Sequence, residues 1–272
     1  MQLTSQGLRE QFEKEGYVVV KNFFSPEEMT TLMNHIKSAK TRNGESGIDR
    51  GSLTFYSSLF FYSKPIQSFM SQQRIIDLLT PIIGPDFWVR WDQAVVKGPG
   101  AGIFPWHQDN AYSDLKEGYY QLWIAMTEMS PDNGGLWLVP RSHKQLLPHR
   151  QTGNHLEWEG TPENPVFIAA EPGDVVLFSS FMLHKTNPNV TQNPRWTYVI
   201  EYMSAEHFDP GVKPPYFVVS RNGISQPEFV HFYRGRLNLM NHLKYFGFRW
   251  KSNLLNLGSK MLKTRLNLRD SR

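Results

Sequence analysis

The chain has 272 residues, of which 40% are hydrophobic and 20% charged, a composition that allows one large folded domain with a substantial core. It contains no cysteine, which excludes disulfides, thiolate nucleophiles, iron–sulfur clusters and cysteine zinc sites and leaves histidine and carboxylates as the strong metal ligands. The net charge is +4. The N-terminus lacks a secretion-signal pattern and no apolar run is long enough to span a bilayer, so we expect a cytoplasmic protein.

The first forty residues predict two helices around a short strand. Residues 5–15 have the spacing of an amphipathic helix, and the β-branched and aromatic run 17–20 favours a strand. Ser25 precedes Pro26, and Glu28 follows three residues after Ser25. This pattern is typical of a capped helix start, and we expect the helix to continue to about residue 39.

The rest of the chain predicts a β core. Residues 41–52 are polar and contain glycine, which indicates a loop, and a helix over about 72–83 should end at Gly84. Regularly spaced β-type runs without intervening helices then indicate an antiparallel sandwich or barrel. These runs are 87–97, 119–129, 135–139, 174–184 and 195–203.

The C-terminal segment 231–272 is a basic extension. It contains ten Lys or Arg and one acid, a local charge of +9, which leaves −5 for residues 1–230. Its many aromatic residues argue against a solvated arm, so we expect at least 231–250 to pack on the same domain, near the pocket mouth or across a dimer interface. Residues 253–268 are also compatible with a basic amphipathic helix that binds a membrane surface or an anionic partner, although a helix packed on protein is the preferred interpretation.

The string Trp106-His107-Gln108-Asp109 is the first candidate for chemistry. In an extended segment, residues i and i+2 point to the same side, so His107 and Asp109 can present an imidazole and a carboxylate to one point. A third ligand would complete the facial two-histidine, one-carboxylate triad that leaves three iron positions open. Because this spacing arises by chance in roughly 0.3 places per chain of this composition, the context must support it.

Support comes from His184 and Arg195. Pro172-Gly173-Asp174 forms a turn before an apolar run that ends at His184, and the next strand opens with Arg195. If these two strands pair, Arg195 returns beside His184, where its guanidinium can bind a carboxylate with two parallel hydrogen bonds. Taken alone, a histidine at the end of a buried strand is more often structural than a metal ligand, and Arg195 would then be interpreted as a surface ion pair.

Several motifs together resemble the phytanoyl-CoA dioxygenase family, in its order and spacing, over roughly residues 8–205. The resemblance fades after that point. The matching segments are 15–20, 96–100, 106–110, 133–135, 140–144 and 172–174, together with His184 and Arg195.

This resemblance implies a mainly β protein with flanking helices, built as a double-stranded β-helix (a cupin-like jelly roll) over residues 1–230. It also implies Fe(II), with 2-oxoglutarate and O2 as cosubstrates. His107, Asp109 and His184 fall on the family's metal positions, and Arg195 falls on its position for the distal carboxylate of 2-oxoglutarate. Three further residues fall near positions that line this cosubstrate: Gln93, Trp123 and Thr186. Packing is an equally valid interpretation of those three.

The activity implied is oxidation of a C–H bond of a small molecule in specialised-metabolite biosynthesis. The outcome is hydroxylation, or demethylation, dealkylation or desaturation by the same iron chemistry. Substrate contacts are expected from residues that flank the motif strands or lie in lid-like segments, although packing is the commoner role of such side chains. These residues are Lys97, Phe104, Tyr112 and Trp137, with Phe55 and Tyr56 as further pocket walls; His143, His149 and His155 are interpreted as structural.

Two alternatives stay open. One is a non-catalytic jelly-roll relative that binds a small molecule. The other is an oxygenase recruited to a membrane or an anionic partner by its basic extension. We expect a monomer or homodimer, no nucleic-acid partner and no membrane contact.

Overall fold

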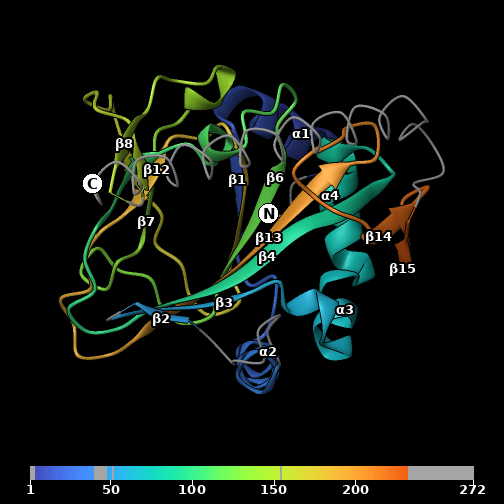
Figure 1. The fold of residues 1–272 in the computed structure, drawn as a ribbon, viewed down its shortest axis with the longest axis horizontal. Helices are drawn as coiled ribbons and strands as arrows, with labels where there is room; N and C mark the ends of the chain where they lie inside the picture. The colour runs from blue at the N-terminus through green and yellow to red at the C-terminus, as the bar shows by residue number, and fades with distance from the viewer. Residues whose placement is uncertain (1–3, 40–47, 51, 154, 232–272) are drawn as a thin grey trace, which may run out of the picture.

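The computed structural model describes residues 4–39, 48–50, 52–153 and 155–231 (Figure 1). In this part of the chain the strands form a nine-stranded, a four-stranded and a two-stranded sheet. The predictions for the basic extension, including the helix at 253–268, lie outside the described residues except for His231. None of the described helices is long and apolar enough to cross a membrane.

The nine-stranded sheet is antiparallel and is organised around two long strands, β4 and β13. Its order is β1-β11-β6-β13-β4-β14-β15. The free edge of β4 is shared, because β14 pairs with the first residues of β4 and β3 pairs with the last. β2 pairs in turn with β3. The strands are β1 (Tyr17–Val20), β2 (Ile48–Arg50), β3 (Leu53–Ser57), β4 (Phe87–Lys97), β6 (Tyr120–Ala125), β11 (Val175–Ser179), β13 (Arg195–Ser204), β14 (Tyr216–Arg221) and β15 (Ile224–Val230).

The four-stranded sheet lies on one side of the long strands, with β7 and β12 at the left of Figure 1. Its order is β10-β7-β12-β5, and β8 and β9 form a separate hairpin. One cavity is lined by residues from both large sheets, so the two sheets face each other across it. This arrangement confirms the predicted jelly roll. The strands are β5 (Phe104–His107), β7 (Leu136–Leu138), β8 (Arg150–Thr152), β9 (His155–Glu157), β10 (Val166–Phe167) and β12 (His184–Thr186).

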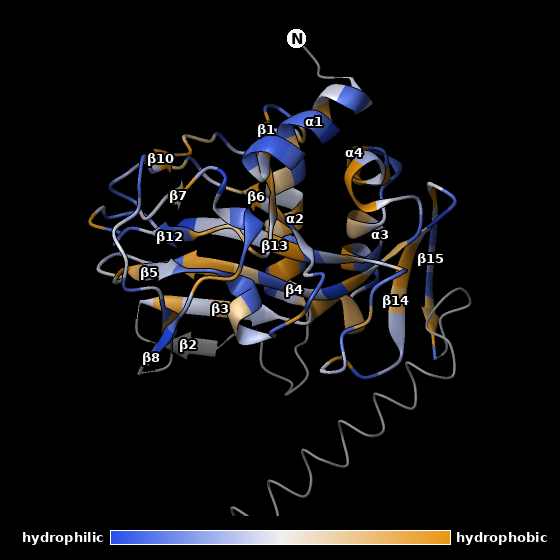
Figure 2. Ribbon diagram, turned by 90° about the horizontal axis from the view of Figure 1, so that it is seen from above, coloured by the Kyte–Doolittle hydropathy of each residue, from blue (hydrophilic) through white to orange (hydrophobic). Residues whose placement is uncertain are grey.

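Helices cover the face of the nine-stranded sheet that points away from the cavity, and α3 and α4 show hydrophobic segments in Figure 2. The predicted cap of the second helix is confirmed, because Glu28 N donates to Ser25 Oγ and Ser25 N donates to Glu28. The helices are α1 (Ser5–Glu15), α2 (Pro26–Ser38), α3 (Lys64–Met70) and α4 (Gln73–Ile83), with short 3-10 turns η1 (Leu59–Phe61), η2 (Asp109–Tyr112) and η3 (Ser142–Lys144).

Alternation along the strands separates the hydrophobic core from the cavity. On β13, Tyr198 and Ile200 join the core under the helices, whereas Thr197 and Val199 line the cavity. A bulge opposite Glu201 and Tyr202 inserts an extra residue in β4, so the consecutive residues 90 and 91 both line cavity space. Apart from this bulge, the alternation of side chains along the strands points one set into the hydrophobic core and the other set, which includes polar residues, into the cavity.

Several elements differ from the predictions. The run 174–184 is two strands, because residues 180–183 turn away from β11 and carry the chain to β12 in the other sheet. Part of the predicted loop 41–52 forms β2, while 41–47 and 51 lie outside the described residues. The prediction also missed β3, α3, β14 and β15. The first two are too short for a clear periodicity, and Pro227 made the edge strand β15 look unlike a strand.

A buried carboxyl under the helices yields a stability prediction. Asp92 is fully buried and accepts hydrogen bonds from Tyr198 Oη (2.7 Å) and Leu59 N (3.2 Å). Burial raises the pKa of Asp92 to about 7 despite these bonds. The unfolded chain releases this proton near pH 4 and the folded chain near pH 7, so stability should fall as the pH rises through this window.

Asp92→Asn cannot ionise and is expected to lose that pH dependence. Its melting temperature should exceed that of the wild type at pH 7.5, and the difference should shrink at pH 5. Calorimetric melting at both pH values tests this, and a difference that does not change with pH would contradict it.

Candidate metal and cosubstrate site

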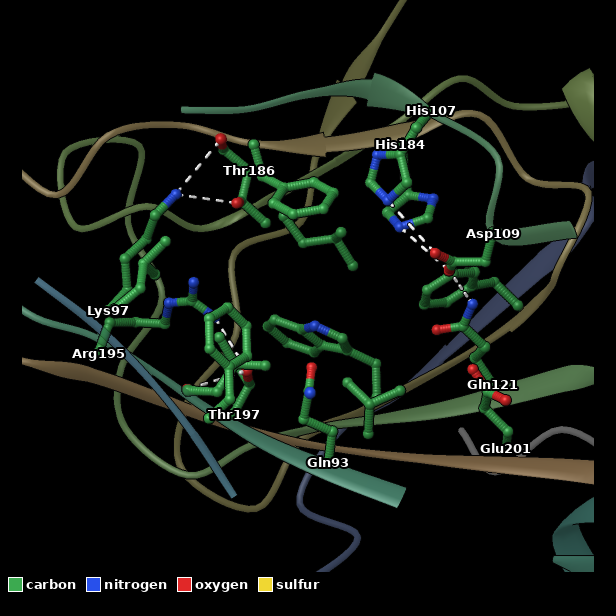
Figure 3. A pocket seen from close by; sticks show the side chains of 18 of the residues that line it. Gln93, Lys97, His107, Asp109, Gln121, His184, Thr186, Arg195, Thr197 and Glu201 are labelled. Atoms are coloured by element: carbon green, nitrogen blue, oxygen red, sulfur yellow. Dashed lines mark hydrogen bonds and ion pairs between the residues drawn. The ribbon is translucent and has the colours of Figure 1, made fainter. Parts of the chain in front are cut away.

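Three predicted ligands converge at one end of the barrel (Figure 3). β5 ends at His107 and pairs with β12 at His184, so the two imidazole rings lie side by side with centroids 4.1 Å apart. Asp109 opens η2 one residue beyond the end of this strand and comes within 3.3 Å of His107 Nε2 and 3.4 Å of His184 Nε2. One ligand atom from each residue lies within 4.8 Å of the others.

The orientation of both imidazoles leaves the same nitrogen available. His107 Nδ1 lies 2.8 Å from the carbonyl of Pro105, and His184 Nδ1 lies 2.9 Å from that of Met182. Each Nδ1–H therefore donates to the backbone carbonyl two residues earlier in the chain, and each Nε2 lone pair points to the cluster. Two imidazole nitrogens and a carboxylate oxygen are a donor set that suits iron(II).

The charges in the cluster also favour a metal. Burial opposes ionisation of Asp109, but the adjacent imidazoles of His184 and His107 and the amide donor of Gln121 outweigh it and hold the pKa of Asp109 well below its usual range. Burial, reinforced by His107, lowers the pKa of His184 to about 4. At neutral pH the pair offers an anionic carboxylate and a neutral imidazole, the forms that bind metal.

Gln121 belongs to the site but was not predicted from the sequence. It lies on β6 and its Nε2 donates to Asp109 Oδ2. Its signal was available, because it shares strand parity with the predicted Trp123. Such outer partners orient a metal ligand, and their loss costs roughly 10–100-fold in metal affinity.

We expect Gln121→Ala to weaken iron(II) binding by about that factor while the melting temperature stays close to that of the wild type. Metal titration monitored by calorimetry measures the effect. Gln6→Ala, at an exposed position on α1, is the matched control. Equal affinities in both variants would remove Gln121 from the site.

The other end of the cavity is cationic. Arg195 is 3% exposed, donates to Thr197 Oγ1 (3.0 Å), and its Nε has no hydrogen-bond partner. Burial lowers the pKa of Arg195 to about 10, which leaves the guanidinium charged at neutral pH. None of the described carboxylates pairs with it. A buried cation with an orphaned donor fits a carboxylate of 2-oxoglutarate.

The predicted route of Arg195 to this place is wrong. The strand that begins at Arg195 pairs with β4 and β6, whereas the strand of His184 pairs with β5 and β7. The two residues belong to opposite sheets and line the same cavity without contacting each other (Figure 3). The cause is the turn at 180–183, which moves His184 out of the sheet that contains β13.

The cavity has a narrow inner part and a wider outer chamber. The inner part has a volume of about 140 Å³ and is lined by the ligand cluster and Arg195. The outer chamber has a volume of about 780 Å³ and shares Asp109 with the inner part. Residues common to both walls are Trp91, Gln93, Phe104, Asp109 and Glu201. The ligand cluster therefore lies where the inner part and the outer chamber meet.

Most of the other predicted residues line these spaces. Trp123, Thr186, Lys97 and Phe55 line the inner part, Tyr112 lines the chamber, and Gln93 and Phe104 line both. Lys97 lies on β4 directly opposite Arg195, at the end of the inner part away from the ligand cluster (Figure 3).

Two predicted pocket residues point elsewhere. Trp137 contacts Phe167 with ring centroids 5.3 Å apart, because its neighbours Leu136 and Leu138 point to the interior. Tyr56 stacks on Trp196 in the helix-covered core. The structure does not bring either one to the cavity.

A buried ion-pair group in the chamber wall was also missed. Arg90 contacts Glu201 and Asp209 and donates to Ser113 Oγ at 2.6 Å. The group connects β4, β13, the loop after β13 and the end of η2. Its signal was absent from the sequence, because the bulge that turns Arg90 inward depends on strand register.

Fold and site together define an iron(II)- and 2-oxoglutarate-dependent dioxygenase. The chain belongs to the phytanoyl-CoA dioxygenase family, whose sequence profile matches residues 12–197. A methylphosphonate hydroxylase from Gimesia maris is 26% identical over 80% of this chain and 86% of its own length. A probable alpha-ketoglutarate-dependent hypophosphite dioxygenase from Stutzerimonas stutzeri is 25% identical over 73% and 78%. The solved structure of ThoJ, a non-heme monooxygenase, shares the fold with a TM-score of 0.69 at 17% identity, covering 88% of this chain and 93% of that one.

Proposed function

We propose that His107, Asp109 and His184 hold the iron and that Arg195 binds the distal carboxylate of 2-oxoglutarate, with Gln93, Trp123 and Thr186 lining the cosubstrate. The observation that best supports this is the position of the ligand cluster. It faces a narrow cavity whose other end contains a buried guanidinium with an Nε that has no hydrogen-bond partner. A dicarboxylate that spans this cavity would meet a complementary group at each end.

The outer chamber is the proposed substrate site. It shares Asp109 with the inner cavity, and aromatic side chains of Trp91, Phe104 and Tyr112 form part of its wall. The Oη of Tyr112 accepts a hydrogen bond from Leu156 N (2.8 Å), which fixes this ring at the chamber mouth. A substrate in the chamber would have a C–H bond beside the iron position while the cosubstrate occupies the inner part.

When bound, iron and 2-oxoglutarate supply the oxidation, in which the cosubstrate is decarboxylated to succinate as dioxygen is consumed. The chain's own residues orient the reactants. Arg195 and Thr197 fix one end of the cosubstrate, and Gln121 fixes the ligand oxygen of Asp109. The apolar walls of Trp123, Leu136 and Phe178 keep water from the inner cavity.

The chamber favours a neutral or basic small molecule. Among its described lining residues the single Lys or Arg is Arg90, and Glu201 and Asp209 already neutralise it. Asp114 adds a further acid to the wall. An anion such as a phosphonate, the substrate type in the name of the Gimesia relative, would find no uncommitted cation among the described residues that line the chamber.

We propose oxidation of such a molecule in specialised-metabolite biosynthesis, with hydroxylation as the default outcome and demethylation, dealkylation or desaturation as variants. The non-catalytic alternative is disfavoured, because a pure binding protein has no need for two imidazole nitrogens and a carboxylate oxygen that converge on one point. Recruitment by the basic extension stays a prediction.

Screening measures succinate formed from 2-oxoglutarate with iron(II) and each of three substrate sets: amines and amino acids, neutral metabolites, and phosphonates. Mass spectrometry then identifies products that gained oxygen or lost hydrogen or a methyl group. We expect substrate-stimulated succinate with the first or second set. Stimulation by phosphonates alone would contradict the proposed substrate class.

A further inference from the structure

Two buried cations face each other at the closed end of the inner cavity. Arg195 on β13 is the direct cross-strand partner of Lys97 on β4, and both side chains line the same cavity (Figure 3). Lys97 is 1% exposed and Arg195 3% exposed. Like charges in directly opposed positions destabilise a sheet, and burial increases the cost. This pair therefore requires an anion, or the loss of one charge, to be stable.

The surroundings of Lys97 accommodate either protonation state. Its Nζ lies 2.9 Å from Thr186 Oγ1 and 3.4 Å from Thr186 O, and it contacts Asn187 O. An ammonium can donate to all three oxygens. A neutral amine can donate to the two carbonyls and accept from the Thr186 hydroxyl, which is both donor and acceptor.

The side chain of Lys97 is held in this place by the turn before β7. A Cβ at Gly134, whose φ is +87°, would come within 2.5 Å of Lys97 Cδ and 2.9 Å of Asn187 O. Only glycine adopts this backbone conformation readily and leaves the space free. The stem of Lys97 is therefore confined, and the amine cannot withdraw to solvent when its charge is unfavourable.

We propose that Lys97 is a second positioning residue for the cosubstrate: it takes up a proton from solvent when the distal carboxylate of 2-oxoglutarate binds beside Arg195, and releases that proton when the carboxylate leaves. This inference rests on the proposed function of the inner cavity. It assigns Lys97 to the cosubstrate and makes cosubstrate binding dependent on pH.

The electrostatics agree with the geometry. Burial, reinforced by the charge of Arg195, lowers the pKa of Lys97 to about 7. Lys97 packs against β3, β13, the turn at 130–135 and residues 186–189. Within the described part of these segments Arg195 is the charged group that faces it, and Asp132 of the turn is exposed to solvent.

A bound carboxylate favours the ammonium and raises the pKa of Lys97. Below pH 7 Lys97 is charged in both states and 2-oxoglutarate affinity is at its maximum. Above pH 7 binding requires proton uptake, so affinity should fall by up to about tenfold per pH unit until the pKa of the bound state is reached.

The test is calorimetric titration of the iron(II)-loaded protein with 2-oxoglutarate without oxygen, at pH 6.5, 7.5 and 8.5. Each pH is measured in two buffers of different ionisation enthalpy, which counts protons directly. We expect most of one proton to be taken up at pH 8.5, with weaker binding there than at pH 7.5. In Lys97→Met both the proton uptake and the pH dependence should vanish.

Lys185→Met is the matched control, because Lys185 lies on β12 beside Thr186 but its Nζ sits over the rings of Trp106 and Trp137, away from the cavity. It should keep the wild-type proton count. If Lys97→Met does not fold, the wild-type proton count still decides. Binding without proton uptake and with constant affinity would overturn the role of Lys97, whereas a wild type that does not bind 2-oxoglutarate at any pH would overturn the proposed function itself.

Discussion

Asp109→Ala is expected to abolish 2-oxoglutarate turnover and to weaken iron(II) binding by more than the 10–100-fold typical of losing an outer-shell partner. The two imidazoles alone leave the divalent ion without the anionic donor of the cluster. The fold should persist, because the hydrophobic core lies under the helices on the other face of the sheet. The melting temperature should move by no more than about 2–4 °C, the shift that 1 kcal/mol produces in a domain of this size.

Metal titration, succinate formation and thermal melting of the same preparation measure these effects together. Asp132→Ala, at an exposed position in the turn before β7, is the matched control and should behave as the wild type. A folded Asp109→Ala protein that still makes succinate at the wild-type rate would show that the metal ligands were assigned wrongly.

Arg195→Ala is expected to raise the Kd for 2-oxoglutarate by roughly thirtyfold or more, because breaking a buried charge-assisted pair costs about 2–5 kcal/mol. Its partner carboxylate would then remain buried with the neighbouring Lys97 as the nearest cation. Arg195→Lys should recover only part of the affinity, since an ammonium cannot make two parallel hydrogen bonds. Iron(II) affinity should be unchanged, because Arg195 is not part of the ligand cluster.

Anaerobic calorimetry with 2-oxoglutarate separates these outcomes. Arg150→Ala removes an exposed surface arginine that pairs with Glu159, and it controls for the loss of net charge. An unchanged Kd in Arg195→Ala would exclude Arg195 from cosubstrate binding.

Local patterns predicted the ligands better than they predicted the paths of the strands. His107 and Asp109 could be paired from their spacing in one extended segment, and their approach to one point is seen in the structure. The position of His184 depended on the resemblance to a family, because a histidine at the end of an apolar run has no specific signal. That its strand joins the opposite sheet could not be predicted, since the turn at 180–183 contains neither proline nor glycine.

The outer chamber could not be predicted from the sequence, for a different reason. Its wall combines η2, the loop around Asp209 and a bulge in β4, and none of these has a recognisable motif. Side chains such as Arg90 and Glu201 acquire their partners only through strand register and burial. Trp137 was predicted to line the pocket because it is an aromatic residue close to family-like motifs. In the structure its side chain lies on the outer face of its strand.

We propose that this barrel binds iron at His107, Asp109 and His184 and uses it to consume 2-oxoglutarate. Sequential calorimetric titration of metal-free protein with iron(II) and then 2-oxoglutarate, without oxygen, tests it most directly, with succinate measured after air is admitted. We expect one iron per chain, one 2-oxoglutarate per iron, no cosubstrate binding without the metal, and succinate only when iron, 2-oxoglutarate and oxygen are all present. Cosubstrate binding that is equally strong with and without iron, or succinate formation that survives Asp109→Ala, would contradict it.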